Sequence, residues 1–431
     1  MRLDDYIEGL QPAEDAKRRR LAAERSYEIL AELEDVEERV DEALQGDSLF
    51  GSTAPSVFVG RSEYPRVPTG ILSPLVDRDT ASAFRTTDEW YQRGLGIQDV
   101  LQYRTGLLNS RRRTSVDVEG TWEGFLGTQR EVAIADRPVD VEIGLSNSPD
   151  LDLSLDDVAT PTGPSATATD AAVTENPHVP PAVEKTLEDD EWTAQGAMTY
   201  LYRRDFDVYE INDILSVGAL GRRDQRRLVP TRWSITAVDD AIGSYLRAQI
   251  RNQPSIDQVE VRANAYMGNR YWVVLAPGAW EYELVEMKAP GSVWNPAPDG
   301  DVWVGSATEG YGGRSGYVDE TAGAYYAARL GVLEHLADRG RQAKALVLRE
   351  VSDEYWAPVG VWQVRESVRN AFDDAPTAAS PELAGRAGIA ESFDAAVGNV
   401  VSELPIGYER LRRNSTLVAG RQSELTAFGG E

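Results

Sequence analysis

Five arginines lie close together in the segment Gly221–Trp233, with Asp224 as the one acidic residue among them. A guanidinium group can bind a phosphate through two parallel hydrogen bonds, so this cluster favours contact with a nucleic-acid backbone. Pairing with nearby carboxylates, such as those of Asp239 and Asp240, is the alternative interpretation. The candidate DNA-backbone contacts in this segment are Arg222, Arg223, Arg226, Arg227 and Arg232.

A further arginine, Arg314, lies in a glycine-rich loop that spans Gly305–Gly316. Glycine lets a phosphate or another backbone approach closely, and aromatic residues such as Trp303 and Tyr317 can stack on unpaired bases. Arg314 is therefore another candidate for DNA binding. The loop is not a P-loop, because no Gly-Lys-Ser or Gly-Lys-Thr follows. A tight structural loop packed by aromatic side chains is the interpretation that we favour for its backbone.

Three charged residues on a predicted strand, Glu283, Glu286 and Lys288, are the candidates for catalysis. Glu286-Met287-Lys288 has the E-x-K pattern that forms half of a restriction-type nuclease signature. In such sites carboxylates hold Mg²⁺ and the lysine helps to orient the attacking water. A strand with a charged outward face is the interpretation that we favour. Mg²⁺ is expected only if the nuclease hypothesis holds, and no other cofactor or metal is predicted.

The C-terminal tail carries a spacing typical of a docking peptide. Gln422, Leu425 and Phe428 fit the pattern Q-x-x-L-x-x-F, which is most of the motif that binds the sliding clamp PCNA. One helical turn places the leucine and the aromatic ring on one side, where both can enter an apolar groove, and the glutamine amide can use a polar pocket. Gly429 stands where the motif usually has a second aromatic residue, which should weaken binding.

The composition limits the chemistry that these residues can perform. The 431 residues include 71 Asp and Glu against 44 Lys and Arg, for a net charge of −27, and only four of the bases are lysine. This combination is typical of adaptation to molar intracellular salt, where the Debye length is only about 3 Å and net charge does not exclude DNA as a partner. The chain has no Cys, which excludes disulfides, Cys-based zinc fingers, iron–sulfur clusters and Cys nucleophiles.

Neither a membrane span nor a secretory signal is visible in the sequence. No apolar run approaches the roughly 18–20 residues that a membrane span needs. The N-terminus carries Asp4 and Asp5 and lacks an apolar core of the kind that secretory signals contain. We therefore expect a soluble cytoplasmic protein with no membrane partner.

Hydrophobic periodicity predicts an α+β fold, with mixed sheets and helices, a long charged helix over 13–45 and a disordered tail after Arg413. Residues 147–181 have the composition of a linker, although the rigid run Pro161–Ser165 leaves an ordered arm open. Helices are predicted at Gln98–Gly106, 182–204, 208–217, 234–251, 321–338 and 383–404. Strand character is found at Ser56–Gly60, Ser115–Glu119, Arg130–Ala135, Val139–Leu145, Val259–Tyr266, Arg270–Leu275, Tyr282–Met287, Lys344–Val351 and Val359–Val364. Gly268-Asn269 indicates a hairpin turn.

Several runs are specific enough to indicate a family: Arg137–Glu142, Gly163–Ser165, Leu228–Asp240, Tyr325–Leu330 and Pro358–Glu366. They resemble the archaeal Nre family of DNA-repair proteins (NreA type), and the resemblance runs from about residue 50 to the end. It implies a role in repairing DNA damage and clamp binding through Gln422, Leu425 and Phe428. Many relatives have a Cys-based zinc module near the N-terminus, which this chain cannot form. The resemblance names no catalytic residues and does not decide whether the chain is an enzyme.

These observations predict four segments: a charged helix at 1–46, an Nre N-terminal-type α+β domain at 47–300, an Nre C-terminal-type α+β domain at 301–410, and a flexible tail with the clamp motif at 411–431. We expect a DNA-damage repair factor that is recruited to PCNA by its tail and contacts DNA through arginine-rich loops. Two alternatives stay open. One is a metal-dependent nuclease acting on damaged DNA, and the other is a non-enzymatic adaptor that links the clamp to other repair proteins.

Overall fold

The computed structural model describes residues 40–74, 76–118, 122–150, 163–297, 300–314, 316–318, 321–373 and 388–420. Most of the predicted N-terminal helix and the whole clamp motif lie outside these ranges. The chain divides into two compact units. Unit 1 contains residues 1–90, 95–242 and 357–359, and unit 2 contains residues 91–94, 243–356 and 360–431. Among the described residues, no helix has both the length and the apolar character needed to cross a membrane.

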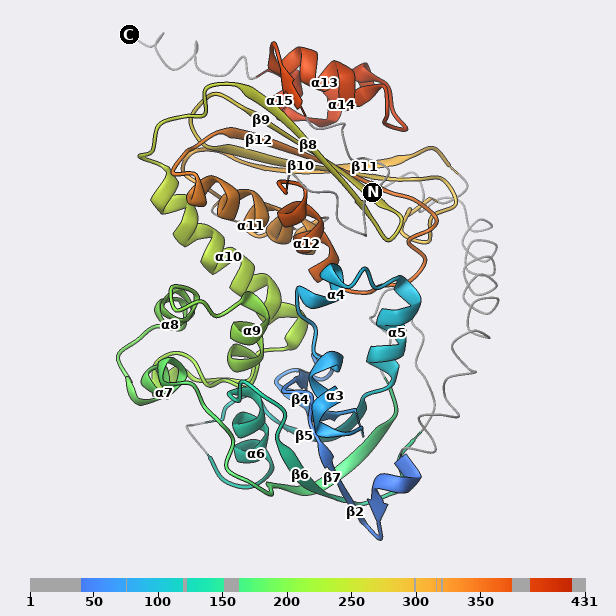
Figure 1. Cartoon of the computed structure of the whole chain (residues 1–431), viewed down its shortest axis with the longest axis vertical. Coiled ribbons are helices and arrows are strands. Elements are labelled where there is room, and N and C mark those ends of the chain that lie inside the picture. The colour runs from blue at the N-terminus through green and yellow to red at the C-terminus, as the bar shows by residue number, and fades with distance from the viewer. Residues whose placement is uncertain are drawn as a thin grey trace. The chain divides into compact units, whose positions relative to one another are not determined.

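Unit 1 is built on a seven-stranded sheet in the order β1-β2-β6-β7-β5-β4-β3 (Figure 1). All neighbouring strands are antiparallel except β5 and β7. The strands are β1 Leu44–Gln45, β2 Ser48–Ser52, β3 Val57–Val59, β4 Arg66–Ser73, β5 Leu108–Ser115, β6 Asp140–Leu145 and β7 Ser165–Val173. β7 lies inside the segment whose composition is that of a linker, so part of that segment is an ordered strand within the sheet.

Helix α6 of unit 1 lies where the sequence predicted a strand. Residues 130–135 were expected to be a strand, but Gly124–Ala133 form α6. Phe125, Gln129 and Val132 recur at helical spacing and are buried. The Gln129 amide donates to Gly70 O of β4 at 3.0 Å, which fixes the helix on the sheet. The other helices that start in this unit are α3 Arg78–Ala81, α4 Glu89–Gln92, α5 Ile97–Thr105, α7 Pro181–Glu188, α8 Ala194–Tyr202, α9 Val208–Ser216 and α10 Thr231–Ile250.

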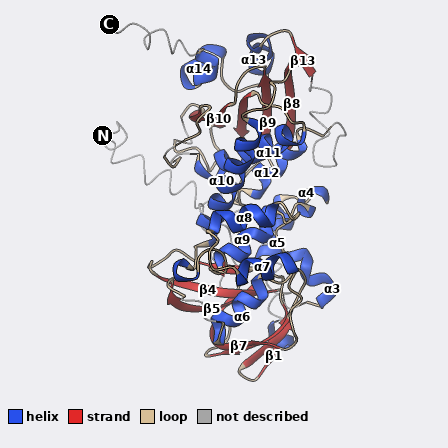
Figure 2. Cartoon of the chain, turned by 90° about the vertical axis from the view of Figure 1, so that its left-hand side faces the viewer, coloured by secondary structure: helices blue, strands red, loops and turns tan. Residues whose placement is uncertain are grey.

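Unit 2 is built on a six-stranded sheet in the order β11-β10-β12-β9-β8-β13, and Figure 2 shows the strands of each unit gathered into a separate sheet. The strands are β8 Val259–Tyr266, β9 Asn269–Ala276, β10 Glu281–Lys288, β11 Trp303–Glu309, β12 Lys344–Val351 and β13 Gly388–Ala390. β11 includes the first residues of the predicted glycine-rich loop. The predicted β8–β9 hairpin is present, and its two turn residues are Met267 and Gly268. Both have positive φ, as a type I′ turn requires.

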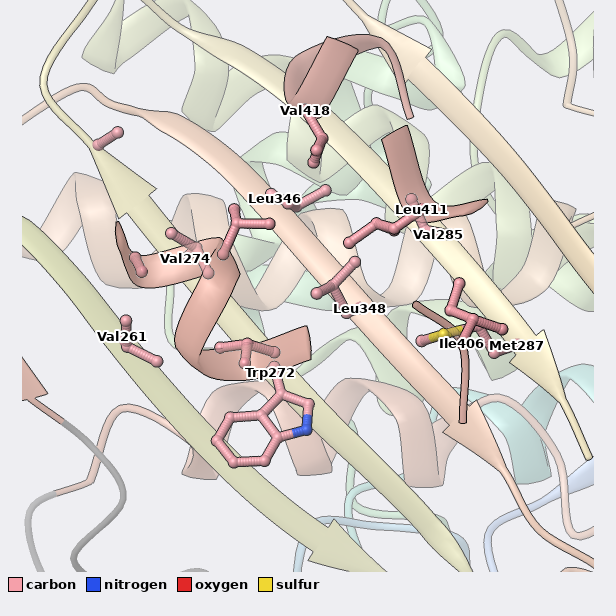
Figure 3. Close-up of a cluster of buried hydrophobic side chains, with 14 of the residues drawn as sticks. Val261, Trp272, Val274, Val285, Met287, Leu346, Leu348, Ile406, Leu411 and Val418 are labelled. Atoms are coloured by element: carbon pink, nitrogen blue, oxygen red, sulfur yellow. The ribbon is translucent and has the colours of Figure 1, made fainter. Parts of the chain in front are cut away.

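The two faces of this sheet differ in chemistry. Helices α13 Phe393–Val401, α14 Tyr408–Asn414 and α15 Thr416–Ala419 cover one face and enclose an apolar cluster that includes Trp272, Val285 and Leu346 (Figure 3). Helices α11 Ala322–Asp338 and α12 Trp362–Asn370 pack on the other face, which holds buried ion pairs such as Arg329–Glu309 at 2.9 Å. The strand predicted at Val359–Val364 is wrong, because α12 begins at Trp362.

The fold class is therefore the predicted one, α+β with mixed sheets.

Candidate functional site

A cleft of about 620 Å³ opens at one end of the β4–β5 pair in unit 1. We call it the arginine cleft. Its walls are the start of β4, the end of β5 and the first turn of α6, and its charged side chains are three arginines and one glutamate. The three arginines are exposed to solvent. The lining residues are Pro65, Arg66, Arg112, Arg113, Thr114, Ser115, Glu123, Gly124, Phe125 and Leu126.

Backbone hydrogen bonds join the cleft to the arginine-rich segment Gly221–Trp233, which we call the arginine loop. Val116 N donates to Pro65 O at 2.9 Å, and Leu228 N donates to Val116 O at 2.9 Å. Beneath these bonds, Val116 and Leu228 pack together with Val67 in a small buried cluster. Three segments that are far apart in the sequence are thus held side by side, and the arginine loop borders the cleft.

The arginine loop presents most of its arginines to solvent, in agreement with a surface role. Arg222, Arg223, Arg227 and Arg232 are exposed. Arg227 pairs with Asp117 at 3.2 Å, and both side chains are more than half exposed. Because surface ion pairs contribute little, about 0–1 kcal/mol, this pairing leaves Arg227 able to exchange partners.

Arg226 is the exception, and it leaves the set of candidate DNA contacts. Its side chain is 6% exposed. Its Nε donates to Gly221 O at 2.9 Å and its Nη2 to Leu187 O at 3.1 Å. Burial lowers the pKa of Arg226, against the opposing charge of Asp190. The guanidinium therefore closes the arginine loop on itself and ties it to the end of α7, where a phosphate has no access.

Exposed aromatic side chains stand around the arginine cleft. Among the described residues of unit 1, the large apolar side chains with substantial exposure are Tyr64 at 51%, Trp233 at 45% and Trp122 at 37%. Tyr64 precedes Pro65 of the cleft wall, and Trp122 precedes Glu123. Trp233 follows Arg232 in the first turn of α10, and its ring centroid lies 5.5 Å from that of Tyr64.

Arg314 and its glycine-rich loop belong to unit 2, so they are a separate feature. Arg314 Nη1 donates to Thr308 O at 2.7 Å and Nε donates to Gly316 O at 3.2 Å. The guanidinium thus holds the two sides of its own loop together, which supports the structural interpretation of the backbone. The side chain nevertheless remains exposed, so its role as a DNA contact stays a prediction.

The two carboxylates among the nuclease candidates lie on opposite faces of β10. Glu283 is fully buried and accepts from Ser415 Oγ and from the backbone N–H groups of Thr416 and Leu417 at 2.7–2.8 Å. Glu286 is three positions along the strand, on the opposite face, where it pairs with Arg349 of β12.

Lys288 lies 3.5 Å from Glu286 Oε2, with its ammonium 4.1 Å from the centroid of the Trp303 ring. Because Glu283 and Glu286 face opposite sides of the sheet, they cannot hold one ion between them. Among the described residues, no three His, Cys, Asp or Glu side chains gather as a metal site would require. Two ion pairs of Glu286, with Arg349 and with Lys288, therefore explain the E-x-K pattern, and Glu283 serves as a helix cap.

The comparisons with known proteins bear on the whole chain. Residues 21–295 match the family model for the N-terminal part of archaeal Nre proteins, and residues 309–428 match the model for the C-terminal part. The chain belongs to the archaeal Nre family. The Nre N-terminal match contains the arginine cleft and the arginine loop, and the Nre C-terminal match contains Arg314 and the tail motif. No solved structure matches the chain at a significant level.

Named relatives are found in two archaea. The DNA repair protein NreA of Haloferax volcanii is 59% identical over 431 residues, covering 99% of this chain and 100% of the relative. The DNA repair protein NreA of Archaeoglobus fulgidus is 38% identical over 342 residues, which are 77% of this chain and 84% of the relative. The DNA repair protein NreB of the same organism is 36% identical over 324 residues, 75% of this chain and 80% of the relative.

Sequence reasoning about this Nre protein missed the cleft itself. Arg111-Arg112-Arg113 is visible as a short basic run, but nothing in the sequence connects it to Arg66 or to the start of α6. The signal that could have helped is Tyr64, a large aromatic residue in a polar turn between two strands. The tail residues Gln422, Leu425 and Phe428 lie outside the described residues, so their role stays a prediction.

Proposed function

We propose that this Nre protein is a DNA-repair factor that contacts DNA through the arginine cleft and the arginine loop of unit 1, and docks on the sliding clamp through Gln422, Leu425 and Phe428. The observation that carries the DNA contact is the gathering of exposed arginines from two separate segments along one border of unit 1. Its Nre relatives that carry names are called DNA repair proteins, which supports the cellular role.

The very acidic composition is compatible with this proposal. At 1 M salt the Debye length is about 3 Å, so a phosphate senses the arginines that it touches and little of the distant acidic surface. Arginine suits such a role because its planar guanidinium binds two phosphate oxygens at once and is less strongly hydrated than an ammonium group. The near absence of lysine therefore does not argue against a DNA-binding surface.

Of the two alternatives, the nuclease has no supporting contact among the described residues, because Glu283 and Glu286 face opposite sides of their strand. The adaptor lacks a DNA contact and links the clamp to other repair proteins, so it also requires that clamp binding is retained. It is therefore the outcome if DNA binding is not found and clamp binding is.

The DNA contact is tested by fluorescence anisotropy with labelled DNA and the full chain. The variant Arg66→Gln, Arg112→Gln, Arg113→Gln removes three positive charges from the cleft wall. If each arginine meets a phosphate, the slope of log affinity against log salt should fall by about 0.7 for each residue with single strands, about 2 in total. Affinity should fall at every salt concentration.

A matched control is Arg412→Gln with Arg413→Gln, because these arginines are exposed on α14 of unit 2. The control should leave the affinity and the slope unchanged. Equal losses in both variants would show a nonspecific charge effect. Unchanged binding in the cleft variant would overturn the assignment of the site.

A further inference from the structure

We propose that the border of the arginine cleft selects unpaired nucleotides, with Tyr64 and Trp233 as a stacking platform for bases whose phosphates meet the cleft arginines. The inference rests on the proposed DNA contact and names its substrate class as single-stranded or locally unpaired DNA. Arginines alone bind the backbone of a duplex and a single strand alike. The aromatic pair is the feature that distinguishes the two.

The position of Tyr64 is set by the turn that carries it. Glu63 has a φ of 61°, a left-handed conformation that costs roughly 1–2 kcal/mol for a residue other than glycine. Glu63 forms an ion pair with Arg113 of the cleft, and Arg66 N donates to Glu63 O at 2.9 Å. These contacts hold the turn while the Tyr64 ring remains 51% exposed.

Trp233 lies in the first turn of α10, and hydrogen bonds to other elements hold the residues on both sides of it. Val59 N donates to Thr231 Oγ1 at 3.0 Å, and the fully buried Ser234 hydroxyl donates to Asn212 Oδ1 at 2.5 Å. Trp233 lies between these two anchored residues, yet 45% of it is exposed. An indole of this size in water loses the stabilisation that burial gives, so its exposure on a rigid element calls for an occupant.

The exposed aromatic rings and the nearby arginines together indicate what kind of ligand binds here. The two ring centroids lie 5.5 Å apart with the rings tilted by 51° to each other, and both residues remain partly exposed to solvent. Unpaired bases have free π-faces, whereas bases in a duplex are already stacked on their neighbours. The exposed Arg232, next to Trp233 in the sequence, and the exposed cleft arginines supply the phosphate contacts.

Salt strengthens the argument for stacking. Phosphate contacts weaken steeply as salt rises, because binding releases counterions whose release is worth less in concentrated salt. Stacking of a base on an aromatic ring involves no ion release and persists. A chain with the composition of a molar-salt protein therefore gains more from an aromatic platform than from additional arginines.

The test uses the full chain in molar KCl, a short labelled single strand of mixed sequence, and the same strand annealed to its complement. The single strand should bind more tightly than the duplex. The variant Tyr64→Ala, Trp233→Ala should weaken single-strand binding roughly 5- to 150-fold, which corresponds to about 1–3 kcal/mol for a stacked base. It should leave the salt slope unchanged, unlike the arginine variant. Tyr64→Phe, Trp233→Phe should keep most of the affinity.

The control is Ile389→Ala, which removes an apolar side chain that is 72% exposed on unit 2 and lies outside the glycine-rich loop. It should not alter binding, and thermal unfolding confirms that all variants fold. Three outcomes overturn the inference. Equal affinity for both probes, or an aromatic variant that binds like the original chain, refutes the stacking platform while the DNA contact stands if the arginine variant still loses affinity. Failure of the original chain to bind either probe refutes the DNA contact as well, and the inference falls with it.

Discussion

At the scale of single residues, burial decides what a charged side chain can do. Arg226 and Arg227 are neighbours in the sequence, yet Arg226 is buried and bonded to backbone carbonyls while Arg227 is exposed. Arg130 is likewise buried, and its Nε donates to Val217 O at 3.1 Å. Desolvation lowers the pKa of Arg130 to about 10, so it stays charged at neutral pH and serves the packing of α6.

His335 carries a prediction about pH. It lies on α11, half-buried, with its ring stacked 3.8 Å from that of Phe372. Burial, aided by the charge of Arg339, lowers the pKa of His335 to about 4. The folded chain therefore resists protonation at this site, while the unfolded chain takes up the proton at a pH near 6.5. The resulting stability is fully present above pH 6.5 and is lost as the pH falls from 6.5 toward 4.

The measurement is urea unfolding of the original chain and of His335→Gln at pH 7.5 and at pH 5. Glutamine cannot be protonated, so the variant lacks this pH dependence. Between the two pH values the original chain should lose roughly 1–2 kcal/mol more than the variant does, given 1.36 kcal/mol per unit of pKa shift. The carboxylates titrate in both chains, so their contribution to the pH dependence cancels when the two changes in unfolding free energy are subtracted. Parallel pH dependences would contradict the assignment.

At the scale of elements, short helices hold their places through side chains from other elements. α15 has only four residues, which is too short to be stable alone. The Glu283 carboxylate of β10 accepts hydrogen bonds from the first backbone N–H groups of α15 and from Ser415 Oγ. Val418 of α15 packs into the apolar cluster of Figure 3. A strand residue that resembles part of a catalytic pattern thus acts as a helix cap.

Replacing Glu283 by Gln should loosen α15. The variant loses the negative charge, and its amide NH₂ group faces the N–H and O–H donors that the carboxylate accepted from. Each lost charged hydrogen bond should lower the free energy of unfolding by about 1.5–3 kcal/mol. Hydrogen exchange should accelerate at Thr416–Ala419 more than elsewhere in unit 2. Glu281→Gln is the control, because Glu281 forms a surface pair with Lys344 that should contribute at most about 1 kcal/mol. Equal exchange in the two variants would contradict the capping role.

At the scale of the whole molecule, the net charge of −27 and the two compact units set the conditions for function. Arginines that are proposed to meet DNA lie in unit 1, and the proposed clamp motif follows α15, the last helix among the described residues. The two proposed contacts can therefore be separated by mutation, which allows each to be measured in the intact chain.

The clamp contact is measured by calorimetric titration of the sliding clamp in molar KCl. Gln422→Ala, Leu425→Ala, Phe428→Ala should weaken binding at least tenfold, or about 1.4 kcal/mol, because the apolar anchors are removed. Ser423→Ala with Thr426→Ala is the control, since these residues occupy variable positions of the motif. Equal binding by the original chain and the triple variant would place the interface elsewhere. No binding by either would remove the clamp from the proposal.

Features that depend on residues close together in the chain could be predicted from the amino-acid sequence. Strand character placed β8 at Val259–Tyr266 and β12 at Lys344–Val351 without error, and the predicted helices agree with α9 and α10 to within three residues. Composition set the acidic character and the absence of cysteine chemistry. The family could be recognised from specific runs such as Leu228–Asp240. A run of residues can be compared with other sequences without knowledge of its structure.

Which arginines reach solvent, and which residues form the cleft, depends on contacts between distant parts of the chain. β7 is rich in Ala and Thr, and its place between β5 and β6 comes from pairing partners rather than from its own pattern. Likewise, Arg66, Arg112 and the first turn of α6 line the same cleft. They do so because backbone hydrogen bonds and packing join strands that are far apart in the chain. Burial and proximity are properties of such long-range contacts, and a local sequence window does not contain them.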